Sequence, residues 1–173
     1  MKIGKVFEEN FKKSVPKEYY FHRLKDQAVA FSGGNSKFST ANPFDCMIYT
    51  GKNLHCIELK SKNGAITFWR EDLDHDGKKH TFEIKKHQIV GLSRAAEYNG
   101  VYAGIVINFR NADKTIYIPI GRFTEFTENT EKNSINYKDA LEIGIELEVK
   151  HLKVNERYNI QQLIEVIESG KYR

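Results

Sequence analysis

Three side chains of this sequence could act together in a chemical step: the carboxylates of Asp45 and Glu58 and the amine of Lys60. Alternating residues on either side of Gly51-Lys52 predict two strands joined by a two-residue turn, with glycine first as a type II′ turn prefers. The register that this turn fixes places Asp45 directly opposite Glu58. Lys60 shares the face of Glu58, because side chains two apart on a strand point the same way.

A cation between Asp45 and Glu58 would explain two acids at this position, since like charges placed opposite each other destabilise a sheet by about 0.2–1 kcal/mol. Mg²⁺ prefers carboxylate oxygens and keeps several waters, and the carbonyl of Leu59 could add a third protein oxygen. A bound ion activates water and stabilises charge on a phosphodiester, and Lys60 could orient that water or stabilise the phosphate. The set predicts metal-assisted phosphodiester hydrolysis. The alternative is an exposed strand end with solvated acids.

Composition limits the possible classes of protein. A chain of 173 residues with 40% hydrophobic residues is long and apolar enough to bury a core, and we expect one domain over residues 1–173. No apolar run reaches the roughly 20 residues of a membrane span, and no apolar signal region follows the charged start, so we expect a cytoplasmic protein without membrane contact. The net charge of +4 permits a polyanionic partner. Cys46 and Cys56 point to opposite faces of the hairpin, which predicts two reduced core cysteines.

The remaining patterns predict the elements that must position these residues. Helical spacing of apolar residues and an aromatic strand precede the hairpin, and a near-continuous apolar run typical of a central strand follows it. The final helix is predicted to start at Asn159, with Gln162 supporting the cap, and to end near Gly170. This order predicts an α/β fold in which helices flank a central mixed sheet. The expected elements are a helix over 4–14, a strand over 19–24, a loop over 26–42, the hairpin over 43–60, a helix over 84–98, strands over 101–109 and 115–120, and short helices and loops over 121–157.

A family resemblance rests on these residues. Pro43-Phe44-Asp45 followed by Glu58-Leu59-Lys60 resembles the motif of the PD-(D/E)xK nuclease superfamily. Residues 4–11 resemble its opening helix, which often contributes an acid; Glu8 is the candidate and Glu9 the alternative. His87-Gln88-Ile89 resembles the histidine-glutamine signature of RecU-like Holliday-junction resolvases. The similarity extends over residues 4–167.

The resemblance implies a restriction-endonuclease-like fold and a homodimeric, Mg²⁺-dependent endonuclease, with Mn²⁺ as a substitute ion. Such enzymes bind four-way DNA junctions in recombination and repair and nick two strands symmetrically. By the match, Asp45 and Glu58 bind metal, Lys60 is catalytic, and Gln88 supports the site or contacts backbone. The chain departs from the pattern in its short 26–42 segment, which corresponds to a longer protrusion used at the junction centre. It also has extra sequence between Glu58 and Gln88.

Basic residues near the acidic pair suggest how DNA is held. Arg23, Lys25 and Lys62 could bind phosphates, which positions DNA without reading its sequence; solvated surface charges are the alternative. His87 and Gln88 are adjacent on the predicted helix and point in different directions, so we expect only Gln88 to face the site.

A second metal pattern lies in the extra sequence. Residues from Asp72 to Glu83 match the spacing of an EF-hand calcium loop, although residues 66–69 before them predict a strand instead of an entering helix. A polar turn explains the same composition. Three alternatives to a junction resolvase therefore remain: another nuclease of the superfamily, of restriction or repair type; a DNA-binding module without catalysis; and a calcium-binding module.

Overall fold

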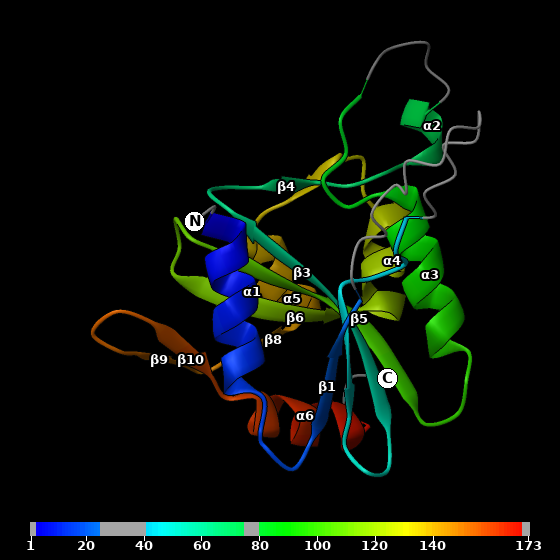
Figure 1. The fold of residues 1–173 in the computed structure, drawn as a ribbon. Coiled ribbons are helices and arrows are strands. Elements are labelled where there is room, and N and C mark those ends of the chain that lie inside the picture. The colour runs from blue at the N-terminus through cyan, green and yellow to red at the C-terminus, as the bar shows by residue number, and fades with distance from the viewer. Residues whose placement is uncertain (1–2, 25–40, 75–79, 171–173) are drawn as a thin grey trace, which may run out of the picture.

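The computed structural model describes residues 3–24, 41–74 and 80–170. A six-stranded sheet in the order β1-β2-β3-β5-β6-β8 forms the centre of the fold (Figure 1). Only β3 and β5 run parallel, and every other neighbouring pair is antiparallel, so the sheet is mixed as predicted. Its strands are β1 (Tyr20–Arg23), β2 (Cys46–Tyr49), β3 (Leu54–Lys62), β5 (Val101–Phe109), β6 (Lys114–Pro119) and β8 (Ile145–Glu146).

Helices cover both faces of this sheet (Figure 1). One face packs against α1 and α6 through a core that includes Phe7, Phe11 and Leu163. The other face packs against α3, α4 and α5 through a core that includes Leu92, Phe123 and Ala140. The prediction of an α/β fold with a mixed sheet flanked by helices is confirmed. The helices are α1 (Ile3–Ser14), α2 (Glu71–Asp74), α3 (Lys86–Ala96), α4 (Ile120–Asn129), α5 (Tyr137–Ile143) and α6 (Ile160–Glu168).

The β2–β3 hairpin has the register that the Gly51-Lys52 turn predicts. Tyr49 pairs with Leu54 and Met47 with Cys56. The Thr50 N–H donates to the Asn53 carbonyl, and Gly51 has φ +90°, a conformation that favours glycine at the first central position. Cys46 and Cys56 are free and belong to the cores on opposite faces, as predicted.

The prediction that Asp45 lies directly opposite Glu58 is wrong in its detail. The regular ladder ends at the pair Cys46–Ile57, and the Asp45 N–H also donates to the Ile57 carbonyl, at 3.1 Å. Two residues of one strand therefore face a single residue of the next, which is the pattern of a β-bulge. Bulges turn side chains away from the regular alternation, and Asp45 consequently lies beside Glu58 instead of in a cross-strand pair with it.

Residues 121–157 contain more strand than the prediction of short helices and loops allowed. Besides β8, they hold β7 (Ser134–Ile135), β9 (Val149–His151) and the start of β10 (Glu156–Tyr158). β9 pairs with β10, while β7 pairs with β4 (Ile66–Thr67). Strands of two or three residues are too short to produce a visible alternation, which explains why the pattern missed them.

Element ends differ slightly elsewhere. α3 begins two residues later than predicted, because the Ile84 N–H donates to the Thr67 carbonyl and its side chain is fully buried. The last helix agrees with its cap signal: the Asn159 side chain accepts from the Gln162 N–H.

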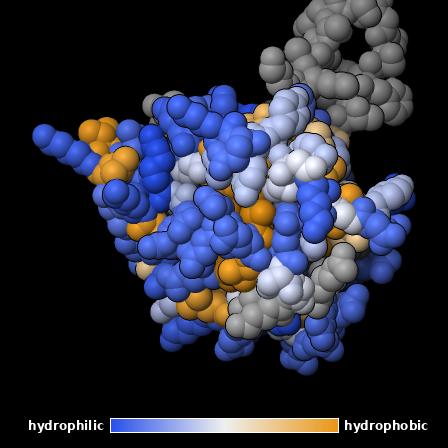
Figure 2. Space-filling view, turned by 90° about the horizontal axis from the view of Figure 1, so that it is seen from below, coloured by the Kyte–Doolittle hydropathy of each residue, from blue (hydrophilic) through white to orange (hydrophobic). Residues whose placement is uncertain are grey.

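Viewed from below Figure 1, the surface is largely hydrophilic with small hydrophobic areas between polar residues (Figure 2). No helix among the described residues is long and apolar enough to cross a lipid bilayer.

Candidate active site

Glu58 lies at the centre of the site and is almost fully buried, with 1% of its surface exposed. Its Oε1 accepts from Lys60 Nζ at 2.7 Å and from Gln88 Nε2 at 2.5 Å. Its Oε2 is buried and accepts from no donor among the described residues, although the Asp45 carboxylate lies within hydrogen-bond reach of Glu58 when one of the two acids is protonated. Burial of a carboxylate oxygen without a donor is costly, and this excludes the alternative of a solvated strand end for Glu58.

The surroundings of Glu58 raise its pKa to about 7. Burial contributes most, since desolvation disfavours the charged carboxylate, and the neighbouring charge of Asp45 adds to it. The ammonium of Lys60 opposes both effects. Asp45 and Lys60 are therefore close enough to Glu58 to act on its charge, and a cation near Oε2 would favour the ionised form.

Asp45 is held at the edge of β3 beside Glu58. Its Oδ2 accepts from the Leu59 N–H at 2.8 Å, and its backbone carbonyl accepts from the Leu24 N–H. In β3, the Leu54 N–H and the Lys62 carbonyl bond towards β5, so the backbone groups of the odd-numbered residues point the other way. The Leu59 carbonyl thus faces the same edge as Asp45, where the sequence placed a third metal-binding oxygen.

A close contact between α3 and the segment before β2 positions Asp45. A Cβ atom on Gly91 would lie 2.4 Å from Pro43 Cβ and 3.0 Å from Pro43 Cα. Only glycine permits this approach, because the contact includes backbone that cannot rotate away. Phe44 is buried in the core on the same face as α3, which fixes the residue directly before Asp45.

Glu8 from α1 and Arg23 from β1 form an ion pair near the acidic residues. Both line one small cavity together with Glu9, Asp45 and Leu59. The structure therefore brings the predicted helix acid to the same cavity as Asp45, and it places the alternative, Glu9, there as well. Arg23 neutralises Glu8 in this arrangement, so a phosphate or cation near Asp45 would meet a paired charge.

The other two predicted DNA-binding residues are Lys62 and Lys25. Lys62 pairs with Glu83 at 2.6 Å and is 40% exposed at its side chain. Lys25 lies outside the described residues. His87, which we expected to point away, is half-buried, and its pKa is lowered by burial and by the positive charges of Lys85 and Lys60. His87 is therefore a neighbour of Lys60 as well as of Gln88.

The first and last residues of the predicted calcium loop form ion pairs with basic side chains of the protein. Asp72 accepts two hydrogen bonds from Arg70, at 2.9 and 3.0 Å. The carboxylate of Glu83 contacts Lys62 and Thr67. Residues 75–79 of the pattern lie outside the described residues. Calcium binding would require both ion pairs to break.

Sequence reasoning missed contacts that α3 makes with other parts of the chain. Gly91 gave no signal, because a glycine inside a helix pattern does not reveal which residue packs against it. Lys86 lies over the ring of Trp69, with Nζ 4.4 Å from the ring centre, and the buried Trp69 Nε1 has no hydrogen-bond partner among the described residues. This contact joins α3 to Trp69, which follows β4. The sequence between the two residues shows no regular period, so no pattern predicted the contact.

Comparisons with known proteins give the following findings. No model of a known protein family matches the chain. It is 28% identical to the SPbeta prophage-derived uncharacterized protein YotM of Bacillus subtilis (strain 168) over 174 residues, which cover 92% of this chain and 84% of that protein. A solved structure of Hjc, a Holliday junction resolvase from the archaeal hyperthermophile Archaeoglobus fulgidus, superposes with a TM-score of 0.47. The superposed residues of this chain and of Hjc are 19% identical, and they cover 83% of this chain and 95% of the Hjc chain.

Proposed function

We propose that this protein is a Mg²⁺-dependent endonuclease that hydrolyses DNA phosphodiester bonds, with Mn²⁺ able to replace Mg²⁺. The observation that carries the proposal is the buried Glu58 carboxylate. Its Oε2 accepts from no donor among the described residues, Asp45 lies beside it, and Lys60 contacts its other oxygen. A buried carboxylate beside a second acid is costly to ionise, and a divalent cation between the two acids would offset that cost.

The residues present fit a hard divalent cation. Glu58 Oε2, the Asp45 carboxylate and the Leu59 carbonyl provide oxygen donors at one edge of β3. Mg²⁺ typically uses one or two protein carboxylates and fills its remaining positions with water and phosphate oxygens. When bound, the ion would lower the pKa of a coordinated water and neutralise charge on the phosphate.

The chain's own side chains supply the remaining steps. Lys60 is anchored on Glu58 and 19% exposed at its side chain, so its ammonium can reach a phosphate oxygen or an attacking water. Gln88 donates to Glu58 and accepts from the Lys85 N–H, which fixes the carboxylate from α3. Gln88 is thus a positioning residue, and Glu8 together with Arg23 sets the charge on the far side of Asp45.

The preferred substrate is proposed to be branched DNA, in particular the four-way junction, cut by a homodimer in recombination or repair. This rests on the resemblance of residues 87–89 and of the acidic motif to RecU-like resolvases. The similarity to a prophage-derived protein supports a phage-type member, in which the sequence segment 26–42 is short. A restriction or repair nuclease and a binding module without catalysis are the rivals.

The test is cleavage of labelled four-way junction, fork and linear duplex with and without Mg²⁺. We expect symmetric nicks in the junction alone, and Asp45→Asn and Glu58→Gln should each reduce the rate roughly 10²-fold or more while junction binding persists. Asp72→Asn, an exposed acid paired with Arg70, is the matched control and should cut normally. Equal cutting of linear duplex would favour the restriction or repair rival. Binding without cleavage in both Mg²⁺ and Mn²⁺ would favour the non-catalytic one.

A further inference from the structure

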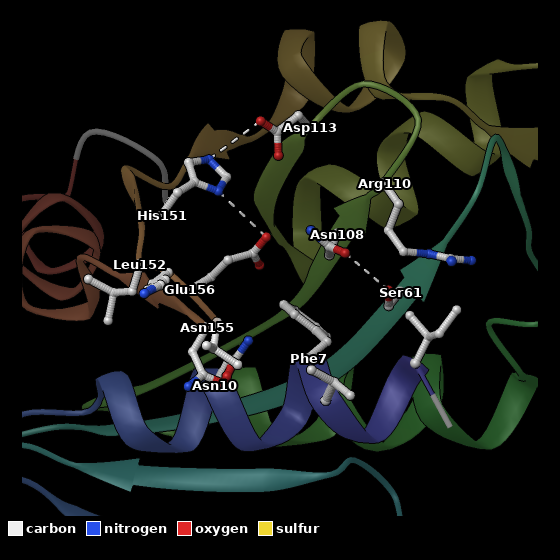
Figure 3. A pocket seen from close by; sticks show the side chains of 14 residues that line it. Phe7, Asn10, Ser61, Asn108, Arg110, Asp113, His151, Leu152, Asn155 and Glu156 are labelled. Atoms are coloured by element: carbon white, nitrogen blue, oxygen red, sulfur yellow. Dashed lines mark hydrogen bonds and ion pairs between the residues drawn. The ribbon is translucent and has the colours of Figure 1, made fainter. Parts of the chain in front are cut away.

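A second group of metal-binding side chains lies away from the acidic pair of β2 and β3. Asp113 is in the turn between β5 and β6, and His151 and Glu156 are partners across the β9–β10 hairpin. Figure 3 shows the three side chains converging at one side of a pocket whose floor includes Phe7 of α1. The pocket has a volume of about 350 Å³.

The spacing of the three groups suits coordination better than direct bonding. His151 Nε2 lies 3.4 Å from Asp113 Oδ2, and His151 Nδ1 lies 3.7 Å from Glu156 Oε1. Both distances exceed the 2.7–2.9 Å of a charge-assisted hydrogen bond. These distances involve different ring nitrogens, and one ion takes only one of them. For Nε2, the 3.4 Å to Asp113 Oδ2 matches two ligands that each lie about 2.1 Å from one ion at a tetrahedral angle. One ligand atom from each residue lies within 4.8 Å of the other two.

The hairpin side of this group is held in place by buried structure. Tyr158, which is 3% exposed, donates from its hydroxyl to Glu156 Oε2 at 2.7 Å, leaving Oε1 directed towards His151. A hydrogen bond of this kind orients ligating carboxylates in metal proteins. Tyr158 is in turn fixed to α1, because its N–H donates to Ser14 Oγ and its ring packs edge-on against Phe7. Asp113 and His151 are exposed, so their side chains can adjust to an ion.

We propose that Asp113, His151 and Glu156 form a second metal site, specific for a divalent transition ion of the Zn²⁺ class. One imidazole nitrogen and two carboxylates with room for water suit Zn²⁺, whereas Mg²⁺ and Ca²⁺ prefer oxygen alone. The bound ion ties the β9–β10 hairpin to the β5–β6 turn. This site uses none of the residues assigned to DNA cleavage, so it does not depend on the nuclease proposal.

The experiment titrates Zn²⁺ into the full chain carrying Asp45→Asn, which weakens the other candidate metal site. Calorimetry gives the affinity, and NMR of the histidine side chains identifies the ligand. We expect saturable binding that shifts the His151 ring signals, and excess Mg²⁺ should not reverse it. His151→Ala and Glu156→Gln should each weaken binding by about tenfold or more.

Matched variants separate a built site from general surface binding. Asp113→Asn keeps a residue that tolerates the φ of +52° at this position while removing the charge, and it should also weaken binding. His22→Ala removes an exposed histidine on β1 and should leave the affinity unchanged. The proposal is overturned if the His151 signals do not move at millimolar Zn²⁺, or if His151→Ala binds Zn²⁺ as tightly as its parent.

Discussion

Gln88 Nε2 lies 2.5 Å from Glu58 Oε1, so a single side chain of α3 holds the central carboxylate of β3. The same oxygen contacts Lys60 Nζ, while the other oxygen accepts from no donor among the described residues. Oε1 is thus occupied by donors of the chain, and Oε2 is the oxygen that remains for a cation. We therefore propose that Oε1 fixes the carboxylate in place and that Oε2 binds the ion.

Replacing Gln88 with alanine should weaken metal binding without unfolding the protein. Without the amide, Glu58 loses the contact that fixes its orientation, and loss of such a supporting hydrogen bond typically reduces metal affinity about 10–100-fold. Calorimetric titration with Mn²⁺ measures the effect. The matched control is Gln161→Ala, because Gln161 makes a similar bond to Glu165 on the exposed face of α6. An unchanged Mn²⁺ affinity in Gln88→Ala would show that Glu58 is positioned by other contacts.

The raised pKa of Glu58 predicts a pH dependence of stability. The folded protein holds a proton on Glu58 up to about pH 7, whereas the unfolded chain releases it near pH 4.5. The folded state therefore binds more protons between these values, and the free energy of unfolding should fall as pH rises from 4.5 to 7, then level off. Denaturant unfolding of the metal-free protein at several pH values tests this. Glu58→Gln should remove that part of the slope.

Metal binding should show the opposite dependence on pH. A cation requires the ionised carboxylate, so Mn²⁺ affinity should rise about tenfold per pH unit below pH 7 and become nearly constant above it. Titrations in buffers with different heats of ionisation should show close to one proton released at pH 6. An affinity that is independent of pH between 5 and 8 would mean that Glu58 does not bind the ion.

The sequence predicted the hairpin and its register because the signals were local. Gly51 marks the turn, and alternation on either side fixes which side chains share a face. It could not predict the bulge at Asp45, since the extra hydrogen bond to Ile57 leaves no trace in the alternation. The approach of Gly91 to Pro43 was equally hidden, because it joins residues 48 positions apart through shape alone.

The second metal group illustrates the same limit. A turn at residues 152–155 would have placed His151 opposite Glu156, which a hairpin interpretation of that segment could have found. Asp113 comes from a separate turn, and no periodic pattern connects it to the hairpin. Gln88 was found only through its resemblance to a known signature. Helical periodicity marks Ile89 and Leu92 as core-facing, but it does not show which polar neighbour reaches a buried acid.

Gly91→Ala should disturb the site from a distance. The added methyl group would overlap Pro43, including its backbone, and overpacking of this kind costs about 1–3 kcal/mol. Movement of Pro43 displaces Asp45, so Mn²⁺ affinity and cleavage should both fall. Gly121→Ala is the control: its Cβ would meet nothing within 4 Å in α4, and alanine should stabilise that helix by up to about 1 kcal/mol. Thermal unfolding and titration of both variants measure the difference. Equal behaviour would contradict the positioning role of Gly91.

Lys60→Met should separate catalysis from metal binding. Methionine keeps most of the apolar stem but removes the ammonium, and Gln88 still holds Glu58 Oε1. Removing the ammonium ends its repulsion of the ion but also raises the pKa of Glu58, so Mn²⁺ affinity should be retained or increased once the pH is high enough to ionise Glu58 in the variant. Cleavage should fall about 10²–10³-fold, since a donor aimed at the reacting phosphate is lost. Lys114→Met removes a similar Lys–Glu pair, with Nζ 2.6 Å from Glu146, at an exposed position and should cleave normally. If Mn²⁺ affinity falls in parallel with cleavage, Lys60 acts only by shaping Glu58 and takes no part in the chemical step.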